Sequence, residues 1–299
     1  MSAERITLRA GALELQVTPA VGGSIARFDW LGPGGRQPLL RGNDGHFSDV
    51  IEAACFPLVP FANRIRGGGF WCGGRNIVLT PNLAGDASPL HGQGWRAAWT
   101  VERVLSDAIE MTYRHGAGEW PWTYEAHQRM TLTPGGLSIE LRCRNLSAPP
   151  MPCGLGLHPY YPCDAQTLLD TSVSSAWTID EAVLPVACVA ATGRYSLRNR
   201  LICGQRLDNG FDGWTSPARI TWPGRVMALA LASGDASRFQ VYSPGEGGFF
   251  VAEPVQNANC ALNAPQAEWK NLGIELLAEG ESRRLLARFS VGASPVRPM

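Results

Sequence analysis

Short runs in which apolar and polar residues alternate recur along this chain. They cover residues 6–8, 13–17, 109–113, 124–132, 137–143 and 285–291. An alternation with a period of two is typical of a β-strand that buries one of its faces. The pattern therefore predicts a strand at each of these places.

The clearest of these signals is a hairpin. The runs at 124–132 and 137–143 flank Thr133-Pro134-Gly135-Gly136, and alternating runs around a Pro-Gly turn are typical of paired antiparallel strands. Helical signals are few by comparison. Residues 56–65 contain two prolines, so they cannot form a regular helix throughout. Residues 266–277 are the candidate for one short helix.

Glycine and proline are frequent throughout the chain. The 34 glycines and 22 prolines among 299 residues favour many short elements over long helices. No linker, low-complexity run or shift in composition divides the chain. The sequence therefore predicts an all-β protein, a large antiparallel β-sandwich in which residues 1–299 form a single domain.

Composition and charge exclude several classes of partner. The chain is 45% hydrophobic, enough for a substantial core, and its 26 basic and 26 acidic residues cancel. Nucleic-acid binding needs clustered Lys and Arg, which this sequence lacks. No apolar stretch approaches the roughly 20 residues that span a bilayer, and the N-terminus has no apolar run of signal-peptide type. We therefore expect a cytoplasmic monomer or homodimer that binds neither nucleic acid nor membrane.

The cysteines follow no recognisable pattern for a metal or for disulfides. No two are spaced as C-x-x-C, and none has a histidine at zinc-finger spacing. In a chain of this size an even cysteine count is weak evidence for disulfides. We therefore expect no metal site, and we expect reduced core thiols at all eight positions, which are Cys55, Cys72, Cys143, Cys153, Cys163, Cys188, Cys203 and Cys260.

His158 ends a segment whose two faces differ. Residues 151, 153, 155 and 157 are apolar, whereas the opposite parity holds Pro152, Gly154, Gly156 and His158. Glycine inside a strand often marks a close approach to the backbone. One interpretation is a ligand that lies on the glycines with His158 at its end. The other is that the glycines admit a neighbouring sheet and His158 caps a strand.

Two more candidates lie in short polar segments. His91 is in the loop segment His91-Gly92-Gln93-Gly94-Trp95, and loops often carry functional groups. Trp95 could stack on the apolar face of a sugar, or it could belong to the core. Glu253 shares a strand parity with Phe249 and Val251, and a carboxylate on an apolar face is costly to bury unless it is paired or functional. A strand-end glutamate in solvent is the alternative.

Arg64 and Asp208 are weaker candidates by themselves. Arg64 precedes a glycine-rich turn, and Asp208 begins the ordinary turn sequence Asp208-Asn209-Gly210-Phe211. A solvated charge or a turn cap is the simpler explanation for each.

The chain also lacks a Walker A loop, a G-x-S-x-G elbow and an H-E-x-x-H motif. This removes the common nucleotide, serine-hydrolase and zinc-protease classes but leaves glycosidases, which need only two carboxylates.

Taken in order, five segments resemble the galactose mutarotase (aldose 1-epimerase) family. They are Asn63-Arg64-Ile65, His91-Gly92-Gln93-Gly94-Trp95, Gly156-Leu157-His158-Pro159-Tyr160, Asp208-Asn209-Gly210-Phe211 and Glu253-Pro254. Each motif is weak alone, but the ordered set is fairly specific. The family's large antiparallel supersandwich also fits the strand pattern, so the resemblance covers essentially the whole chain.

The resemblance implies roles for these residues. Glu253 would be the general base and His158 the general acid, and no metal or organic cofactor would be needed. Family members commonly carry a histidine in the Asp-x-x-Phe segment, where this chain has Asn209 and Gly210, and residues 255–260 also depart from the family pattern. Both departures concern the choice of sugar. The residues expected to bind the small-molecule sugar are Arg64, His91, Asp208, Asn63 and Trp95.

The implied reaction is an exchange of anomers. The ring opens to the aldehyde, turns about C1–C2 and closes on the other face, which takes one proton from the C1 hydroxyl and gives one to the ring oxygen. Ordinary pKa values of about 4.3 for Glu and 6.5 for His suit a carboxylate base and an imidazolium acid. An adjacent carboxylate is expected to favour the charged histidine.

Three alternatives stay open. One is a hexose-6-phosphate 1-epimerase, for which Arg64, Arg66, Arg75 and Arg96 are the available cations. The second is a retaining glycoside hydrolase that uses Glu253 and Asp208. The third is a sugar-binding module that performs no chemistry.

Overall fold

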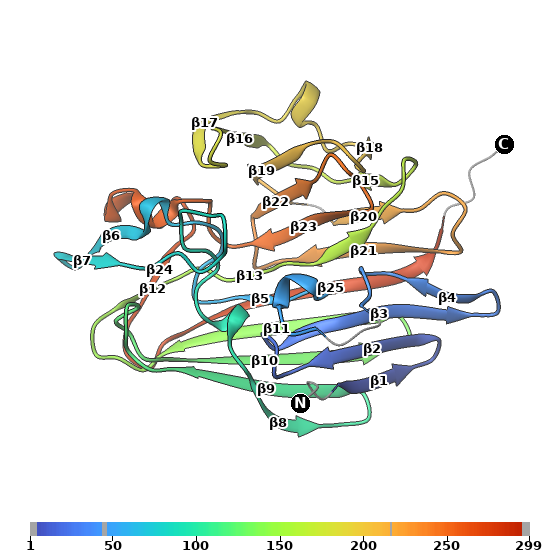
Figure 1. Ribbon diagram of the computed structural model, residues 1–299, viewed down its shortest axis with the longest axis horizontal. Coiled ribbons are helices and arrows are strands. Elements are labelled where there is room, and N and C mark those ends of the chain that lie inside the picture. The colour runs from blue at the N-terminus through green and yellow to red at the C-terminus, as the bar shows by residue number, and fades with distance from the viewer. Residues whose placement is uncertain (1–4, 44–46, 216, 295–299) are drawn as a thin grey trace.

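The structure is a computed structural model that describes residues 5–43, 47–215 and 217–294. Almost all of its regular structure is strand, arranged mainly in two large sheets, and the ladders between named strands are antiparallel (Figure 1). The predicted all-β, antiparallel architecture is confirmed.

The larger sheet has nine strands in the order β18-β15-β20-β21-β25-β11-β10-β9-β8. Its central ladders join long strands, and β10 pairs with β11 from Tyr124–Asn145 to Thr133–Gly136, which confirms the predicted hairpin. The bounds are β8 Thr100–Val104, β9 Ala108–His115, β10 Tyr124–Thr133, β11 Gly136–Asn145, β15 Leu168–Asp170, β18 Arg200–Leu201, β20 Ala218–Thr221, β21 Met227–Ser233 and β25 Ser282–Ala293.

The second sheet has eight strands, seven of them in the order β17-β16-β19-β22-β23-β13-β5, with β14 paired to β23. Its bounds are β5 Pro57–Leu58, β13 Gly156–Leu157, β14 Tyr160–Pro162, β16 Ser175–Ile179, β17 Pro185–Ala190, β19 Leu207–Asp212, β22 Arg238–Ser243 and β23 Phe249–Val255.

Smaller units complete the fold. A four-stranded sheet of β1 (Ile6–Ala10), β2 (Leu13–Thr18), β3 (Ser24–Gly32) and β4 (Gly35–Pro38) contacts β10 through β1 and β2. Two strand pairs lie together at one end of the molecule in Figure 1: β6 (Gly69–Cys72) with β7 (Arg75–Val78), and β12 (Met151–Cys153) with β24 (Glu275–Leu277). Single 3₁₀ turns occur at Val50–Glu52, Arg66–Gly68, Gly94–Arg96, Gly193–Tyr195, Ala261–Asn263 and Gln266–Glu268.

The candidate short helix within 266–277 is reduced to a single 3₁₀ turn. Only Gln266–Glu268 forms a 3₁₀ turn, Gly273 adopts a left-handed φ of 84°, and residues 275–277 pair with β12 as strand β24. The pairing of Leu277 with Met151 brings buried apolar side chains together. This contact with a distant segment outweighs the local helical preference.

The core lies between the two large sheets. Leu207, Phe239 and Phe250 of the eight-stranded sheet belong to the same buried cluster as Leu231 and Phe289 of the nine-stranded sheet. A second, smaller cluster that includes Phe56, Leu90, Trp95 and Val251 packs beside the eight-stranded sheet. No helix among the described residues is long and apolar enough to cross a membrane.

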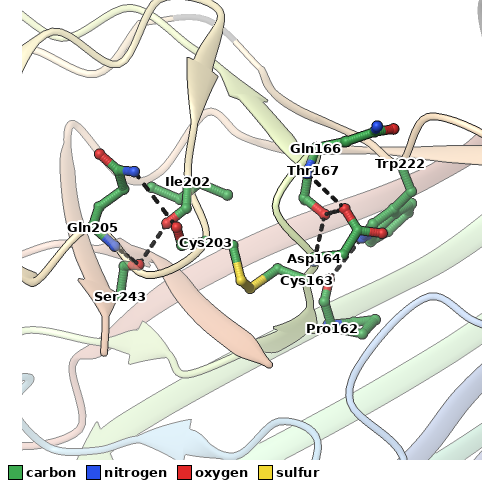
Figure 2. Close-up of a disulfide and its surroundings, with 10 residues drawn as sticks. All are labelled: Pro162, Cys163, Asp164, Gln166, Thr167, Ile202, Cys203, Gln205, Trp222 and Ser243. Carbon is green, nitrogen blue, oxygen red and sulfur yellow. Dashed lines mark hydrogen bonds between the residues drawn. A yellow bond between two sulfur atoms is a disulfide. The ribbon is translucent and has the colours of Figure 1, made fainter. Parts of the chain in front are cut away.

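A disulfide between Cys163 and Cys203 corrects the expectation that all eight cysteines are reduced. Figure 2 shows the bond, whose Cα atoms are 5.6 Å apart, within the range that a disulfide bridges. Cys163 lies where the chain passes from β14 to β15, and Cys203 where it returns from β18 to β19. The bond therefore ties together two crossovers between the large sheets, which the 40-residue separation could not reveal. Cys188 is also not a core thiol, because it is exposed.

Candidate active site

A cavity of about 270 Å³ opens on one face of the eight-stranded sheet. It gathers residues from six separate parts of the chain. Six of the seven side chains predicted from the sequence line it, and the full lining is Asn63, Arg64, Leu83, Leu90, His91, His158, Tyr160, Asp208, Gln240, Tyr242 and Glu253.

Strand alternation places the polar floor of this cavity. In β19, β22 and β23 one parity supplies core residues such as Leu207, Phe239 and Phe250, so the other parity must face the opposite side of the sheet. Register then aligns that opposite parity, because Gln240 pairs with Glu253 and Asp208 pairs with Tyr242 across adjacent strands.

Glu253 and His158 lie next to each other in the cavity. The His158 Nε2 atom lies 3.6 Å from Glu253 Oε1. Glu253 is only 2% exposed, and its Oε2 has no hydrogen-bond partner among the described residues. A buried carboxylate oxygen without a partner is costly, so this atom marks a place for a polar ligand.

Burial sets the charge of this pair. It raises the pKa of Glu253 well above its ordinary value, an effect that the Asp208 carboxylate strengthens and Arg64 opposes. Burial also lowers the pKa of His158 to about 3. Both shifts favour the uncharged forms. Desolvation, with a smaller contribution from Arg41 at His158, therefore works against the charged histidine that was expected beside a carboxylate.

The glycines before His158 admit protein rather than a ligand. A Cβ atom on Gly154 would meet the Asn257 side chain, and one on Gly156 would meet Leu58 and Val255. Of the two interpretations of this segment, close packing of neighbouring strands is the correct one. His158 nevertheless lines the cavity, where its ring stacks on Phe56 at a centroid distance of 4.5 Å.

His91 is locked to Asn63 by two hydrogen bonds. The His91 backbone N–H donates to the Asn63 carbonyl at 3.0 Å, and the Asn63 N–H donates to His91 Nδ1 at 3.1 Å. Because Nδ1 accepts, the neutral ring carries its proton on Nε2. Burial lowers the pKa of His91, with His158 and Arg64 adding to the effect. His91 is therefore a fixed neutral donor.

Both residues of this lock have left-handed backbone conformations, with φ of 63° at Asn63 and 60° at His91. Such conformations are uncommon for residues other than glycine and cluster at functional sites. The side chain of Asn82 braces the His91 loop, since its amide donates to the Leu90 carbonyl at 2.7 Å and its oxygen accepts from the Leu90 N–H at 2.8 Å.

Arg64 reaches the cavity from a firmly held segment. Its backbone N–H donates to Asn259 Oδ1 at 3.0 Å, and its carbonyl accepts from the Cys260 N–H at 3.1 Å. Its side-chain Nε donates to Asp86 Oδ2 at 2.8 Å. No local pattern singles out Asp86 or Asn259 for this role, because both are distant from Arg64 along the chain.

Asp208 is held by a residue that the sequence analysis missed. Gln240 Nε2 donates to Asp208 Oδ1 at 2.8 Å, while Gln240 Oε1 is buried without a partner among the described residues. Burial raises the pKa of Asp208, opposed by Arg64 and by the Gln240 hydrogen bond. Alternation in Arg238-Phe239-Gln240-Val241-Tyr242 was a usable signal, since it puts Gln240 and Tyr242 on one face.

Trp95 does not line the cavity. It is 1% exposed, and its indole N–H donates to the carbonyls of Leu90 and Gly92 at 3.1 Å each. Its ring meets His91 edge-on at a centroid distance of 5.5 Å. The expected stacking on a sugar is therefore corrected to a role beneath the site, where Trp95 supports the His91 loop.

A larger hollow of about 550 Å³ lies elsewhere, along β24, and its lining includes Trp269, Lys270 and Leu276. None of the residues predicted from the sequence lines it. Among the described residues, no group of three or more His, Cys, Asp or Glu side chains is arranged to hold a metal ion. The chemistry of the smaller cavity is that of a buried acid–base pair surrounded by hydrogen-bonding side chains.

Comparisons with known proteins agree with this geometry. The family model described as aldose 1-epimerase matches residues 4–290. The uncharacterized protein YphB of Escherichia coli strain K12 is 36% identical over 228 residues, which are 75% of this chain and 76% of that protein.

Solved structures share the fold over nearly the full length. One from Escherichia coli K12, described provisionally as an aldose 1-epimerase, is 31% identical with a TM-score of 0.86, covering 97% of this chain and 99% of that one. A galactose mutarotase-like protein from Clostridium acetobutylicum is 19% identical with a TM-score of 0.85, covering 97% and 95%. With its acid–base cavity, its fold and these matches, the chain belongs to the aldose 1-epimerase family.

Proposed function

We propose that this cavity interconverts the α and β anomers of an unphosphorylated aldose. The observation that carries the proposal is the Glu253–His158 pair, 3.6 Å apart and buried in a cavity lined with hydrogen-bonding groups. Ring opening needs one group to accept the C1 hydroxyl proton and a second to protonate the ring oxygen. Two adjacent groups that exchange one proton meet this need.

The proton balance follows from the pair. When the proton is on His158, Glu253 is a carboxylate that accepts the C1 hydroxyl proton while His158 donates to the ring oxygen. The open-chain aldehyde then lies beside a neutral Glu253 and a neutral His158, which is the state that burial favours. Closure on the other face of C1 reverses both transfers. The pair therefore holds one proton before and after each turnover.

The remaining lining groups suit sugar hydroxyls. His91 offers a fixed donor, Arg64 offers further N–H groups, and Asp208 and Gln240 offer acceptors. Each can bind a hydroxyl that changes little during ring opening. Their expected contribution is to affinity and orientation.

Charge in the cavity argues against a hexose 6-phosphate. Arg64 is the single Arg or Lys among the described lining residues, and it is already paired with Asp86. Arg66, Arg75 and Arg96 do not line the cavity. Two carboxyl groups, Asp208 and Glu253, face the sugar instead. The described lining residues therefore offer a phosphate dianion no unpaired Arg or Lys, which a neutral aldose does not need.

Polarimetry on freshly dissolved aldoses tests the proposal. We expect the protein to accelerate the change in optical rotation of at least one neutral aldose. We expect no acceleration for hexose 6-phosphates. Release of reducing sugar from an aryl glycoside would instead favour a retaining glycoside hydrolase. Binding of aldoses without acceleration of mutarotation would favour a sugar-binding module.

Location and assembly remain proposals. The sequence predicts a cytoplasmic monomer or homodimer, whereas disulfides are rare in cytosolic proteins. The Cys163–Cys203 bond and the predicted location therefore conflict. Alkylation of thiols in intact cells, followed by mass spectrometry, would establish whether the bond is formed where the protein acts.

A further inference from the structure

Asp86 lies outside the cavity but controls a residue within it. Its Oδ2 accepts from Arg64 Nε at 2.8 Å, and the two side chains are only 16% and 14% exposed. An ion pair this sheltered is screened less by solvent than a surface pair. Asp86 is not among the lining residues, so it acts on a bound sugar through Arg64.

The carboxylate of Asp86 is itself held in place. Its Oδ1 accepts from the Ser88 N–H at 2.9 Å, and its backbone N–H donates to the Leu83 carbonyl at 3.2 Å. One oxygen therefore fixes the carboxylate to its own loop and the other fixes Arg64. The loop that carries Asp86 also contributes Leu83 and Leu90 to the cavity lining.

Arg64 has little freedom left once Asp86 is bound. Asn259 and Cys260 hold its backbone, and Leu90 pairs with it in an isolated bridge. The backbone contacts leave only the side-chain torsions of Arg64 unrestrained. The hydrogen bond from Arg64 Nε to Asp86 then orients the plane of the guanidinium. The Nη groups of a guanidinium held through Nε remain available as donors.

Asp86 also changes the charge that a ligand meets. Without it, Arg64 would be a free cation facing Asp208 and Glu253. With it, the Arg64 charge is balanced from outside the cavity, and the described lining residues offer no unpaired Arg or Lys to an anionic ligand. Building on the proposed function, we propose that Asp86 is a positioning residue that orients Arg64 and, by neutralising it, makes the site select neutral over anionic aldoses.

The test compares Asp86→Asn with the wild type on a neutral aldose and on the matching hexuronate and hexose 6-phosphate. Asparagine keeps an oxygen for the Ser88 N–H but loses the charge. We expect KM for the neutral aldose to rise while kcat stays within about twofold, because Asp86 does not touch the reacting atoms. The preference for the neutral over the anionic sugar, as a ratio of affinities from calorimetry, should fall at least about tenfold.

A double-mutant cycle shows whether Asp86 acts through Arg64. In an Arg64→Ala background, Asp86→Asn should change affinity and selectivity by less than about twofold, since the partner is gone. Asp180→Asn is a matched control, because Asp180 faces Arg66 in an exposed ion pair outside the cavity. This control should change neither KM nor selectivity.

The outcomes separate the two proposals. Equal effects of Asp86→Asn with and without Arg64, or unchanged selectivity in an active enzyme, would overturn the role of Asp86 alone. A wild-type protein that binds neutral aldoses but does not accelerate mutarotation would overturn the proposed reaction, and the calorimetric comparison would still decide the role of Asp86. Failure of the wild type to bind any neutral aldose would overturn both.

Discussion

The two large sheets share the same alternation of polar and apolar residues, but their polar faces have different surroundings. On the nine-stranded sheet the outward parity carries ion pairs such as Arg129–Glu110 at 2.7 Å and Arg142–Glu140 at 2.9 Å, whose arginines are about half exposed. On the eight-stranded sheet the corresponding parity of β19, β22 and β23 is closed over by loops, and Glu253 becomes buried.

The difference shows what creates chemistry here. Exposed charges on a strand are screened by water and contribute little. The same residue types under the loops that carry His91 and Asp86 lose water, and burial then moves the pKa of Glu253 upward and that of His158 downward. The sheet that carries the site differs from the other sheet in that loops bury its polar side chains, rather than in the types of those residues.

The largest expected effect is a loss of kcat that occurs on the eight-stranded sheet and not on the nine-stranded sheet. Glu253→Gln keeps the shape of the side chain but removes its ability to accept a proton. We expect kcat for mutarotation to fall by at least about 10²-fold while sugar affinity changes little, because the lost interaction belongs to proton transfer. Glu140→Gln on the nine-stranded sheet is the control and should leave kcat unchanged. Near-normal mutarotation by Glu253→Gln would refute the proposed base. Polarimetry measures both variants.

His158→Asn should behave in the same way as Glu253→Gln. It removes the group that protonates the ring oxygen, so we again expect a fall in kcat of about 10²-fold or more with little change in affinity. His127→Asn, on β10 of the other sheet, is the control. A large loss of affinity with kcat preserved would show that His158 binds sugar instead of moving a proton.

The crossovers that join the two sheets should matter for stability but not for catalysis. Replacing both Cys163 and Cys203 by serine opens the bond, and we expect the free energy of unfolding to fall by about 2–4 kcal/mol. Cys188→Ser, at an exposed free thiol, should change it negligibly. Denaturant unfolding under non-reducing conditions measures this. An unchanged midpoint in the double variant would show that the bond does not hold the sheets together.

Residues that hold sugar hydroxyls should have smaller effects than the acid–base pair. Arg64→Ala removes charged donors, and we expect sugar affinity to weaken by about 10- to 100-fold with kcat less affected. Asp208→Asn should weaken binding to a lesser degree, since the amide keeps one acceptor. Arg142→Ala on the nine-stranded sheet is the control. Calorimetry measures the affinities and polarimetry measures kcat. Unchanged affinity with a large fall in kcat for either variant would contradict a binding role.

The smallest effect concerns pH. The pair needs one proton in total, so activity should fall when a second proton is added or the single one is lost. Burial lowers the pKa of His158 to about 3, so the pair binds a second proton only in acid. Burial raises the pKa of Glu253, so the pair keeps its single proton to a higher pH than an ordinary glutamate would. We therefore expect kcat to stay nearly constant from pH 7 down to about 5, below the ordinary histidine pKa of about 6.5. An acid limb near pH 6.5 would contradict the shifts.

Local sequence determined much of this protein. Period-two alternation is a property of neighbouring residues, so the hairpin of β10 and β11 and the strands near both ends could be read directly. The ordered motifs also located six of the lining residues, and three of these, His91, His158 and Glu253, directly precede a glycine or proline that shapes their own segment.

Only the tertiary structure decided the rest. The pairing of Gln240 with Glu253 depends on strand register, and the Cys163–Cys203 bond depends on where two crossovers meet. The Arg64–Asp86 contact depends on how a loop folds back on a distant segment. Trp95 went to the core because its loop carbonyls satisfy the indole N–H there. The charge of Glu253 and His158 is set by how far the surrounding loops exclude water, and burial of that kind is a property of the whole fold that no single segment encodes.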